Sequence, residues 1–123
     1  MAHDFPTAFY ACVECALWSS HDYDQDGNGG ENLDANYDES DLTDEARAEM
    51  AGDLAAFIAD NSDDLEGMDD AQIGHDFWLT RNGHGAGFWD RGLGERGERL
   101  TRAAKVYGSV DLYVTDDNKI GAQ

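Results

Sequence analysis

Apolar residues recur at helical spacing near the start of the chain. Between residues 6 and 20, the apolar positions three or four residues apart are Phe9, Val13, Ala16 and Leu17. This spacing places them on one face of an α-helix. Pro6 or Thr7 can begin such a helix, because proline in the first turn lacks only an N–H that would be unpaired there. We therefore expect a first helix that ends at the serine pair of residues 19 and 20.

A second helical pattern covers residues 43–61 and is strongly acidic. Its apolar face consists of Met50, Leu54, Phe57 and Ile58. Its opposite side carries Glu45, Glu49, Asp53 and Asp60. Thr43 or Asp41 can cap this helix, and acids in the first turn suit the positive end of its dipole. Carboxylates one turn apart repel each other, so helix stability does not explain the acidic side.

Residues 74–91, GHDFWLTRNGHGAGFWDR, combine four large aromatic side chains with a glycine-rich centre. Alternation of Phe77 and Leu79 with Trp78 is typical of a strand. Asn-Gly at positions 82 and 83 is a common hairpin turn. The pattern predicts an aromatic β-hairpin over residues 75–91, with most of the aromatic rings in the core.

The remaining chain adds a third helix near residues 98–107, ended by Gly108, and a strand at residues 109–114. A turn at residues 116–118 lets Lys119 and Ile120 pair back on that strand. The expected fold class is α+β: a small antiparallel sheet of three or four strands, packed with about three helices, in a single domain over residues 1–123.

The two halves of the chain differ in charge, because the formal net charge of −19 is unevenly distributed. Residues 1–74 hold 20 of the 27 acidic residues and one of the eight basic residues, Arg47, whereas the acids and bases of residues 75–123 balance. Part of this surplus lies in a long acidic loop over residues 21–42. A net charge of about 2–8 is sufficient for the solubility of a small domain. The acidic half therefore indicates a function for the charge.

Two smaller features limit the possibilities. The longest apolar run, residues 8–18, is interrupted by Glu14 and is too short for a membrane span, so we expect a cytoplasmic protein. Cys12 and Cys15 lie one turn apart on the first predicted helix without a second pair, which favours reduced, partly buried thiols over a disulfide framework, a zinc site or a redox pair.

An incomplete calcium motif opens the acidic loop. Asp22, Asp24, Asp26 and Gly27 follow the spacing of an EF-hand loop. Position twelve of that loop is Leu33 instead of the bidentate glutamate. A solvated or partner-ordered acidic loop is therefore the preferred interpretation, and calcium binding stays an alternative.

The aromatic stretch also carries a resemblance. Together with ALWSS and LDANYDESDL before it and LTRAAKVYGSVDLYV after it, GHDFWLTRNGHGAGFWDR resembles a family of small acidic proteins encoded by bacteriophages and prophages. The similarity covers nearly the whole chain. It implies a phage origin and a bacterial host cytoplasm, and it supplies no catalytic residues.

The leading functional hypothesis is a DNA mimic without enzymatic activity or cofactor. An ordered array of carboxylates can occupy the Lys and Arg side chains that bind phosphates in a basic groove. Phage mimics of this size and charge target host enzymes such as DNA gyrase, restriction enzymes or CRISPR effectors, and two copies could pair to lengthen the anionic surface. The expected partner-binding residues are Asp22, Asp24, Asp26, Glu31, Asp34, Asp38, Glu39, Asp41, Glu45, Glu49, Asp53, Asp60, Asp63 and Asp64.

Two alternatives rest on the predicted hairpin. His75, Asp76, His84 and Asp90 could converge on a divalent metal, with Arg81 or Arg91 holding a phosphate, as in a small hydrolase. In the other alternative, Trp78 and Trp89 stack on the bases of a single-stranded nucleic acid, and the C-terminal arginines follow its backbone.

Overall fold

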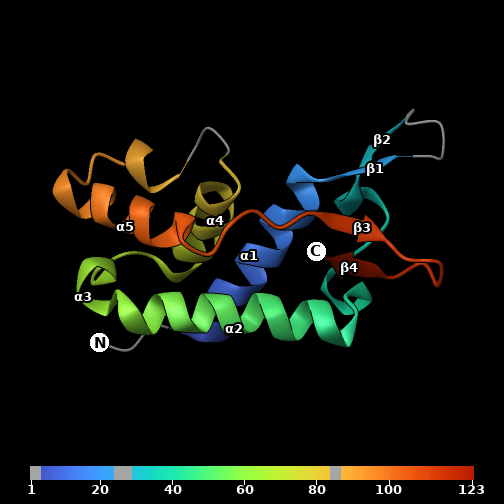
Figure 1. Ribbon diagram of the computed structural model, residues 1–123, viewed down its shortest axis with the longest axis horizontal. Helices are drawn as coiled ribbons and strands as arrows, with labels where there is room; N and C mark the ends of the chain where they lie inside the picture. The colour runs from blue at the N-terminus through green and yellow to red at the C-terminus, as the bar shows by residue number, and fades with distance from the viewer. Residues whose placement is uncertain (1–3, 24–28, 84–86) are drawn as a thin grey trace.

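The computed structural model describes residues 4–23, 29–83 and 87–123 (Figure 1). Its α-helices are α1 (Phe5–Ser19), α2 (Asp44–Asp60), α3 (Ser62–Leu65), α4 (Asp70–Arg81) and α5 (Glu95–Lys105). Short 3-10 helices are η1 (Leu33–Ala35), η2 (Glu39–Asp41) and η3 (Phe88–Asp90). The strands are β1 (His21–Tyr23), β2 (Gly29–Asn32), β3 (Leu112–Val114) and β4 (Ile120–Ala122). The predicted α+β class is confirmed, with more helix than expected.

Helices α1 and α4 share the most extensive contact among the described helices, and Gly74 lets their backbones approach each other. A Cβ atom at Gly74 would lie 1.9 Å from the carbonyl oxygen of Ala8, far inside van der Waals contact. The two backbones therefore touch where the helices cross. The indole Nε1 of Trp78 on α4 donates a hydrogen bond to the Ser19 hydroxyl at the end of α1, at 3.1 Å. This contact anchors α4 along the core side of α1.

The predicted hairpin over residues 75–91 is wrong, because residues 70–81 form α4. Asp69 caps this helix by accepting a hydrogen bond from the Gln72 backbone N–H at 3.2 Å. Every residue from Asp76 to Arg81 is buried, so α4 lacks the exposed face that gives an amphipathic helix its period. Asn82 and Gly83, with φ +73° at the glycine, end the helix instead of turning a hairpin.

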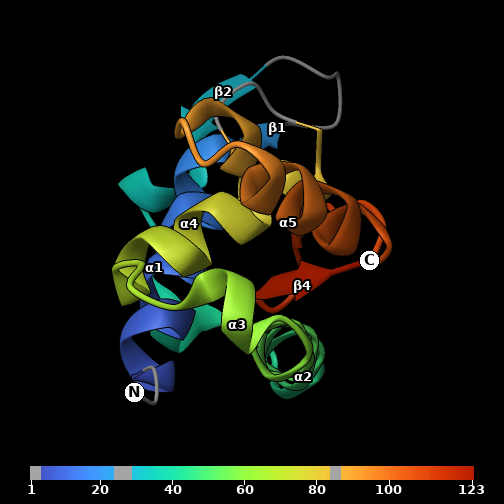
Figure 2. The same cartoon turned by 90° about the vertical axis from the view of Figure 1, so that its left-hand side faces the viewer.

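Helix α2 agrees closely with its predicted span. The Thr43 hydroxyl accepts a hydrogen bond from the Ala46 N–H at 3.0 Å, as expected for the N-cap. Met50, Leu54 and Phe57 are buried. Figure 2 shows α2 end-on at the edge of the molecule, so one side of the helix faces the core and the other faces solvent.

The aromatic side chains do form the core, although not from a hairpin. The Phe57 ring lies 4.6 Å from that of Phe77 and 5.6 Å from that of Phe88, between ring centroids. Trp78 is also buried. Trp89 is the exception, since 42% of its surface is exposed.

Strands occur in two short antiparallel ribbons, β1–β2 and β3–β4, instead of one sheet of three or four strands. The predicted return of residues 119–120 onto the strand near residue 112 is confirmed, because Val114 pairs with Ile120. The carbonyl of Ile120 accepts a hydrogen bond from the Thr43 N–H at 2.9 Å, which ties this ribbon to the start of α2. Ribbon β1–β2 lies within the predicted acidic loop.

The other elements follow expectation with shifted boundaries. Helix α5 begins three residues before its predicted start, and Leu100 and Ala104 are buried as predicted. Cys12 and Cys15 are buried free thiols. None of the helices in the described part of the chain combines the length and the apolar character that a bilayer-spanning segment needs.

Candidate functional site: an anionic surface beside a groove

Half of the eight Lys and Arg side chains are paired with acids in the described part of the chain. Four arginines form ion pairs: Arg47 with Glu39, Arg81 with Asp53, Arg91 with Asp76, and Arg99 with Asp64. The guanidinium of Arg81, which is 4% exposed, also donates to the carbonyl oxygens of Gly108 and Tyr107 at 2.9 and 3.1 Å. The few cations therefore stabilise tertiary structure and leave most carboxylates uncompensated.

Many of the predicted partner-binding carboxylates are at the surface. Within the described ranges, the predicted acids that form no ion pair are Asp34, Asp38, Asp41, Glu45, Glu49, Asp60 and Asp63. Glu39 and Asp64 lie on the surface too, but each is paired with an arginine. Asp22 and Glu31 belong to β1 and β2, and Asp24 and Asp26 lie outside the described residues together with the rest of the calcium-like motif.

These carboxylates are not one continuous stripe along α2. We define the first acidic cluster as Asp38, Asp41, Asp44, Glu45 and Glu49, and the second acidic cluster as Asp60, Asp63 and Glu66. Between the clusters the exposed positions of α2 are the small residues Gly52, Ala55, Ala56 and Ala59. At 1.5 Å per residue, Glu49 and Asp60 are about 16 Å apart along the axis.

Asp53 does not belong to the free acidic side, contrary to the helical-spacing prediction. Its carboxylate lies 3.0 Å from a terminal nitrogen of Arg81 and is partly covered. A helical wheel places Asp53 one turn after Glu49, but the wheel does not contain Arg81, which reaches α2 from the end of α4. The tertiary contact turns this residue from a surface charge into half of an ion pair.

The start of the first acidic cluster is held in place by a reciprocal capping box. The Asp38 carboxylate accepts a hydrogen bond from the Ser40 N–H at 2.9 Å, and the Asp41 carboxylate accepts one from the Asp38 N–H at 2.9 Å. Hydrogen bonds from the hydroxyl and backbone of Ser40 lower the pKa of Asp38. The start of the first acidic cluster is therefore partly preorganised before any partner arrives, with Asp38 held in its charged form.

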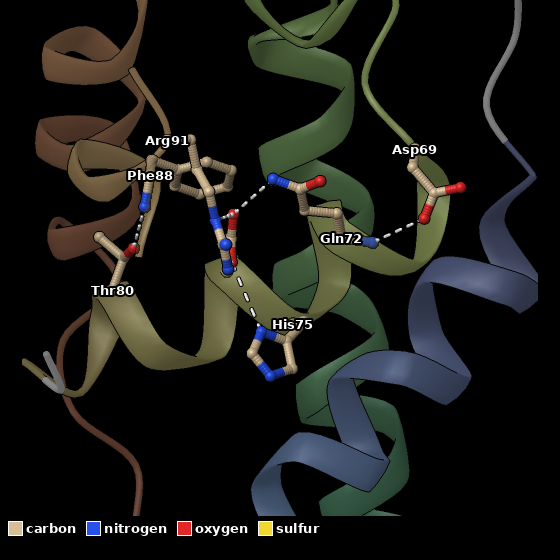
Figure 3. A network of polar contacts seen from close by, with 7 residues as sticks. Asp69, Gln72, His75, Thr80, Phe88 and Arg91 are labelled. Atoms are coloured by element: carbon tan, nitrogen blue, oxygen red, sulfur yellow. Dashed lines mark hydrogen bonds and ion pairs between the residues drawn. The ribbon is translucent and has the colours of Figure 1, made fainter. Parts of the chain in front are cut away.

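Two residues of the predicted metal site, His75 and Asp76, belong to a buried polar network (Figure 3). Both oxygens of Asp76, which is fully buried, are bound by the Arg91 guanidinium at 2.8 and 3.0 Å. The Nε2 of Gln72 and the Nδ1 of His75 each lie 3.4 Å from this carboxylate. Asp90 lies on η3, and His84 is outside the described residues. The described residues contain no group of three or more His, Cys, Asp or Glu arranged to hold a metal.

The two tryptophans predicted to stack on bases differ in burial: Trp78 is buried and Trp89 is exposed. Trp78 is 2% exposed and cannot stack on a base. Trp89 is accessible, with the Lys105 ammonium 5.8 Å from its ring. Of the two rings that the single-strand alternative uses for stacking, only Trp89 is therefore available.

A groove that sequence reasoning missed lies along the outer side of α1. It has a volume of about 760 Å³. Its residues from α1 include Tyr10, Glu14 and Trp18, which stand four residues apart and therefore share one side of the helix. Tyr10 and Trp18 are 53% and 56% exposed. Large aromatic residues beside the predicted apolar face, on a side of the helix with no assigned partner, were the signal that could have revealed the groove.

The two walls of the groove differ in charge. One wall is contributed by the η1–η2 region: Asp34, Tyr37, Asp38 and Glu39. The other wall contains Gln72, His75 and Arg91. Asp38 belongs both to this wall and to the first acidic cluster, so the groove opens directly beside the anionic surface.

Comparisons of this chain with protein-family models, with curated proteins and with solved structures gave no match.

Proposed function

We propose that this protein is a phage-encoded DNA mimic that binds a DNA-handling enzyme of its bacterial host in the cytoplasm and blocks its basic groove. Host enzymes of this kind include DNA gyrase, restriction enzymes and CRISPR effectors. The observation that carries the proposal is that, among the described residues of the first half of the chain, most surface carboxylates form no ion pair, whereas four arginines are paired with acids within the protein. Enzymatic activity and a cofactor are not part of the proposal.

The surplus is costly to the protein on its own, which supports a role in binding. Like charges on one small domain repel and destabilise the compact state. A cationic groove on a partner would relieve this repulsion, just as it relieves the repulsion between DNA phosphates. Binding would also release condensed counterions, which provides much of the affinity of DNA-binding proteins.

The spacing of the carboxylates indicates which arrangement of DNA phosphates they imitate. A DNA strand carries one charge per about 3.4 Å of axis, whereas successive turns of α2 rise about 5.4 Å. The first and second acidic clusters, about 16 Å apart, therefore imitate two groups of phosphates instead of a continuous strand. Two copies of the chain paired side by side would extend this array.

The test is a pull-down from bacterial lysate with tagged protein, eluted either with salt or with duplex DNA. We expect one DNA-binding enzyme that both treatments release. The variant Asp44→Asn, Glu45→Gln, Glu49→Gln neutralises three carboxylates that form no ion pair in the described structure, and we expect it to reduce recovery at least tenfold. Asp53 is left intact because its ion pair with Arg81 supports the fold.

A matched control neutralises three exposed carboxylates elsewhere: Glu95→Gln, Glu98→Gln and Asp111→Asn. This control changes net charge equally, so it should keep most of the binding if position matters. Recovery that is unchanged by the first variant, or reduced equally by both, would show that the first acidic cluster is not the binding surface. An affinity that does not weaken between about 50 and 200 mM salt would also contradict the mimicry.

A further inference from the structure

The groove along α1 combines an apolar floor with an acidic wall, which is a different chemistry from the anionic surface alone. Tyr10 and Trp18 lie eight residues apart on α1, which is about 12 Å along the helix axis. Both rings are more than half exposed, so the chain leaves a large apolar area in water beside its most charged region. A groove lined by exposed apolar side chains and rimmed by polar residues, unlike a single exposed side chain, is typical of an interaction site.

The charges around these rings select a cation. Glu14 stands between Tyr10 and Trp18, and its hydrogen bond with Tyr10 raises the pKa of that phenol. Asp34 and Asp38 contribute carboxylates from the facing wall. Aromatic faces attract Lys and Arg side chains through the ring quadrupole, and nearby carboxylates strengthen the attraction.

The opposite wall limits what can enter. The Arg91 guanidinium is fixed by its two hydrogen bonds to the buried Asp76, so its positive charge stays at the edge of the groove. His75 lies beside it. A ligand that is basic on all sides would meet this wall unfavourably, whereas an amphipathic segment can turn its basic side toward the acids and its polar backbone or acidic side chains toward Arg91.

We propose that this groove binds a short amphipathic segment of the target protein, about two helical turns long, that carries a large apolar side chain and a Lys or Arg side chain. The apolar side chain lies on the floor between Tyr10 and Trp18, and the cation faces Glu14 and the acidic wall. This inference rests on the proposed function and adds specificity to it. Basic grooves are common to many DNA-binding proteins, whereas an apolar anchor next to the groove can distinguish one of them.

The experiment uses two synthetic peptides of equal charge and length. The amphipathic peptide, acetyl-LKKLLKKLLKKLLK-amide, has seven lysines and seven leucines, and the control peptide replaces every leucine with glycine. Affinities are measured by fluorescence anisotropy at 50 and 500 mM NaCl. At the higher salt we expect the leucine peptide to bind at least tenfold more tightly than the glycine peptide. Amide shifts of the labelled protein should change along α1.

Single-residue variants then test whether the leucine peptide binds in the groove along α1. Trp18→Ala and Tyr10→Ala should each weaken the leucine peptide about tenfold at 500 mM NaCl, while Trp89→Ala, which removes an exposed tryptophan elsewhere, should not. Glu14→Lys, at an exposed position, should weaken binding without removing apolar surface and covers the case in which an aromatic variant misfolds. Equal affinities of the two peptides at high salt, an unaffected Trp18→Ala, or an equal loss in Trp89→Ala would each overturn the proposal.

The same peptides separate this inference from the proposed function. The variant Asp44→Asn, Glu45→Gln, Glu49→Gln should leave the binding of the leucine peptide at 500 mM NaCl within about twofold of wild type. If Trp18→Ala binds the peptides normally but the charge variant still abolishes DNA-displaceable capture of the host enzyme, only the groove is refuted. If the charge variant captures the enzyme as well as wild type, the mimicry itself fails.

Discussion

Replacing Arg91 with alanine should destabilise this protein severely, because it strands a buried carboxylate. Asp76 is fully buried and receives two hydrogen bonds from Arg91, at 2.8 and 3.0 Å. Without the guanidinium, only the more distant Gln72 and His75 remain near the charge, each at 3.4 Å.

The magnitude follows from burial. Breaking a buried ion pair by removing one partner costs about 3–5 kcal/mol, whereas an exposed pair contributes about 0–1 kcal/mol. The chain offers a matched exposed pair, Arg99 with Asp64, which has the same bidentate geometry at 2.7 and 2.9 Å but an arginine side chain that is 50% exposed. Arg99→Ala should therefore cost at most about 1 kcal/mol. The difference is large compared with a total stability of about 5–15 kcal/mol.

Urea unfolding followed by circular dichroism measures both variants. With a slope of about 1–3 kcal/mol per molar urea, Arg91→Ala should lower the midpoint by more than about 1 M, while Arg99→Ala should shift it only slightly. Adding Asp76→Leu to Arg91→Ala removes the stranded charge and should recover most of the loss. If Arg91→Ala and Arg99→Ala cost the same, or if the second substitution recovers nothing, burial of Asp76 is not the cause.

Two further predictions concern the core. Gly74→Ala should destabilise the protein by about 1–3 kcal/mol or more, because its Cβ would lie 1.9 Å from the Ala8 carbonyl oxygen. Gly52→Ala, with open space at its Cβ, should stabilise α2 by up to about 1 kcal/mol. Thermal melts that rank the two variants the other way would contradict the close crossing of α1 and α4. Burial raises the pKa of Cys12 and Cys15 to about 12, so iodoacetamide at pH 8 should label the native thiols at least about 100-fold more slowly than the urea-unfolded thiols. Because the unfolded thiols lose their protons first, stability should fall as the pH rises from about 9 to 12, and a flat profile there would argue against their burial.

Helices with one apolar face could be predicted from the sequence. The faces of α1 and α2 are read from residues such as Val13 and Leu54, which recur at a spacing set by the helix itself. Helix α4 could not be predicted in this way, because the burial of every residue from Asp76 to Arg81 removes the polar half of the pattern. Its end at Asn82 and Gly83 uses the same residues as a hairpin turn, so only the position of α1 against Gly74 distinguishes the two structures.

For the candidate site, too, composition could be predicted from the sequence, whereas the pairing of individual charges could not. That the first half of the chain carries a large negative surplus is a matter of composition, and no tertiary structure can change it. Which carboxylates remain available depends on the arginines that reach them from distant elements, as Arg81 reaches Asp53 and Arg99 reaches Asp64. Periodicity along one helix contains no information about such partners.

The fold class, the amphipathic helices and the excess of negative charge can be predicted from the sequence, because they depend on local spacing and on residue counts. Which charges are free, how the aromatic core is assembled, and that Tyr10 and Trp18 line a groove with Asp34 and Asp38 depend on tertiary contacts. These features need elements that are far apart in the chain to meet at the distances of van der Waals contact and hydrogen bonds. The packing of α1 against α4, and of the η1–η2 region against α1, supplies those distances.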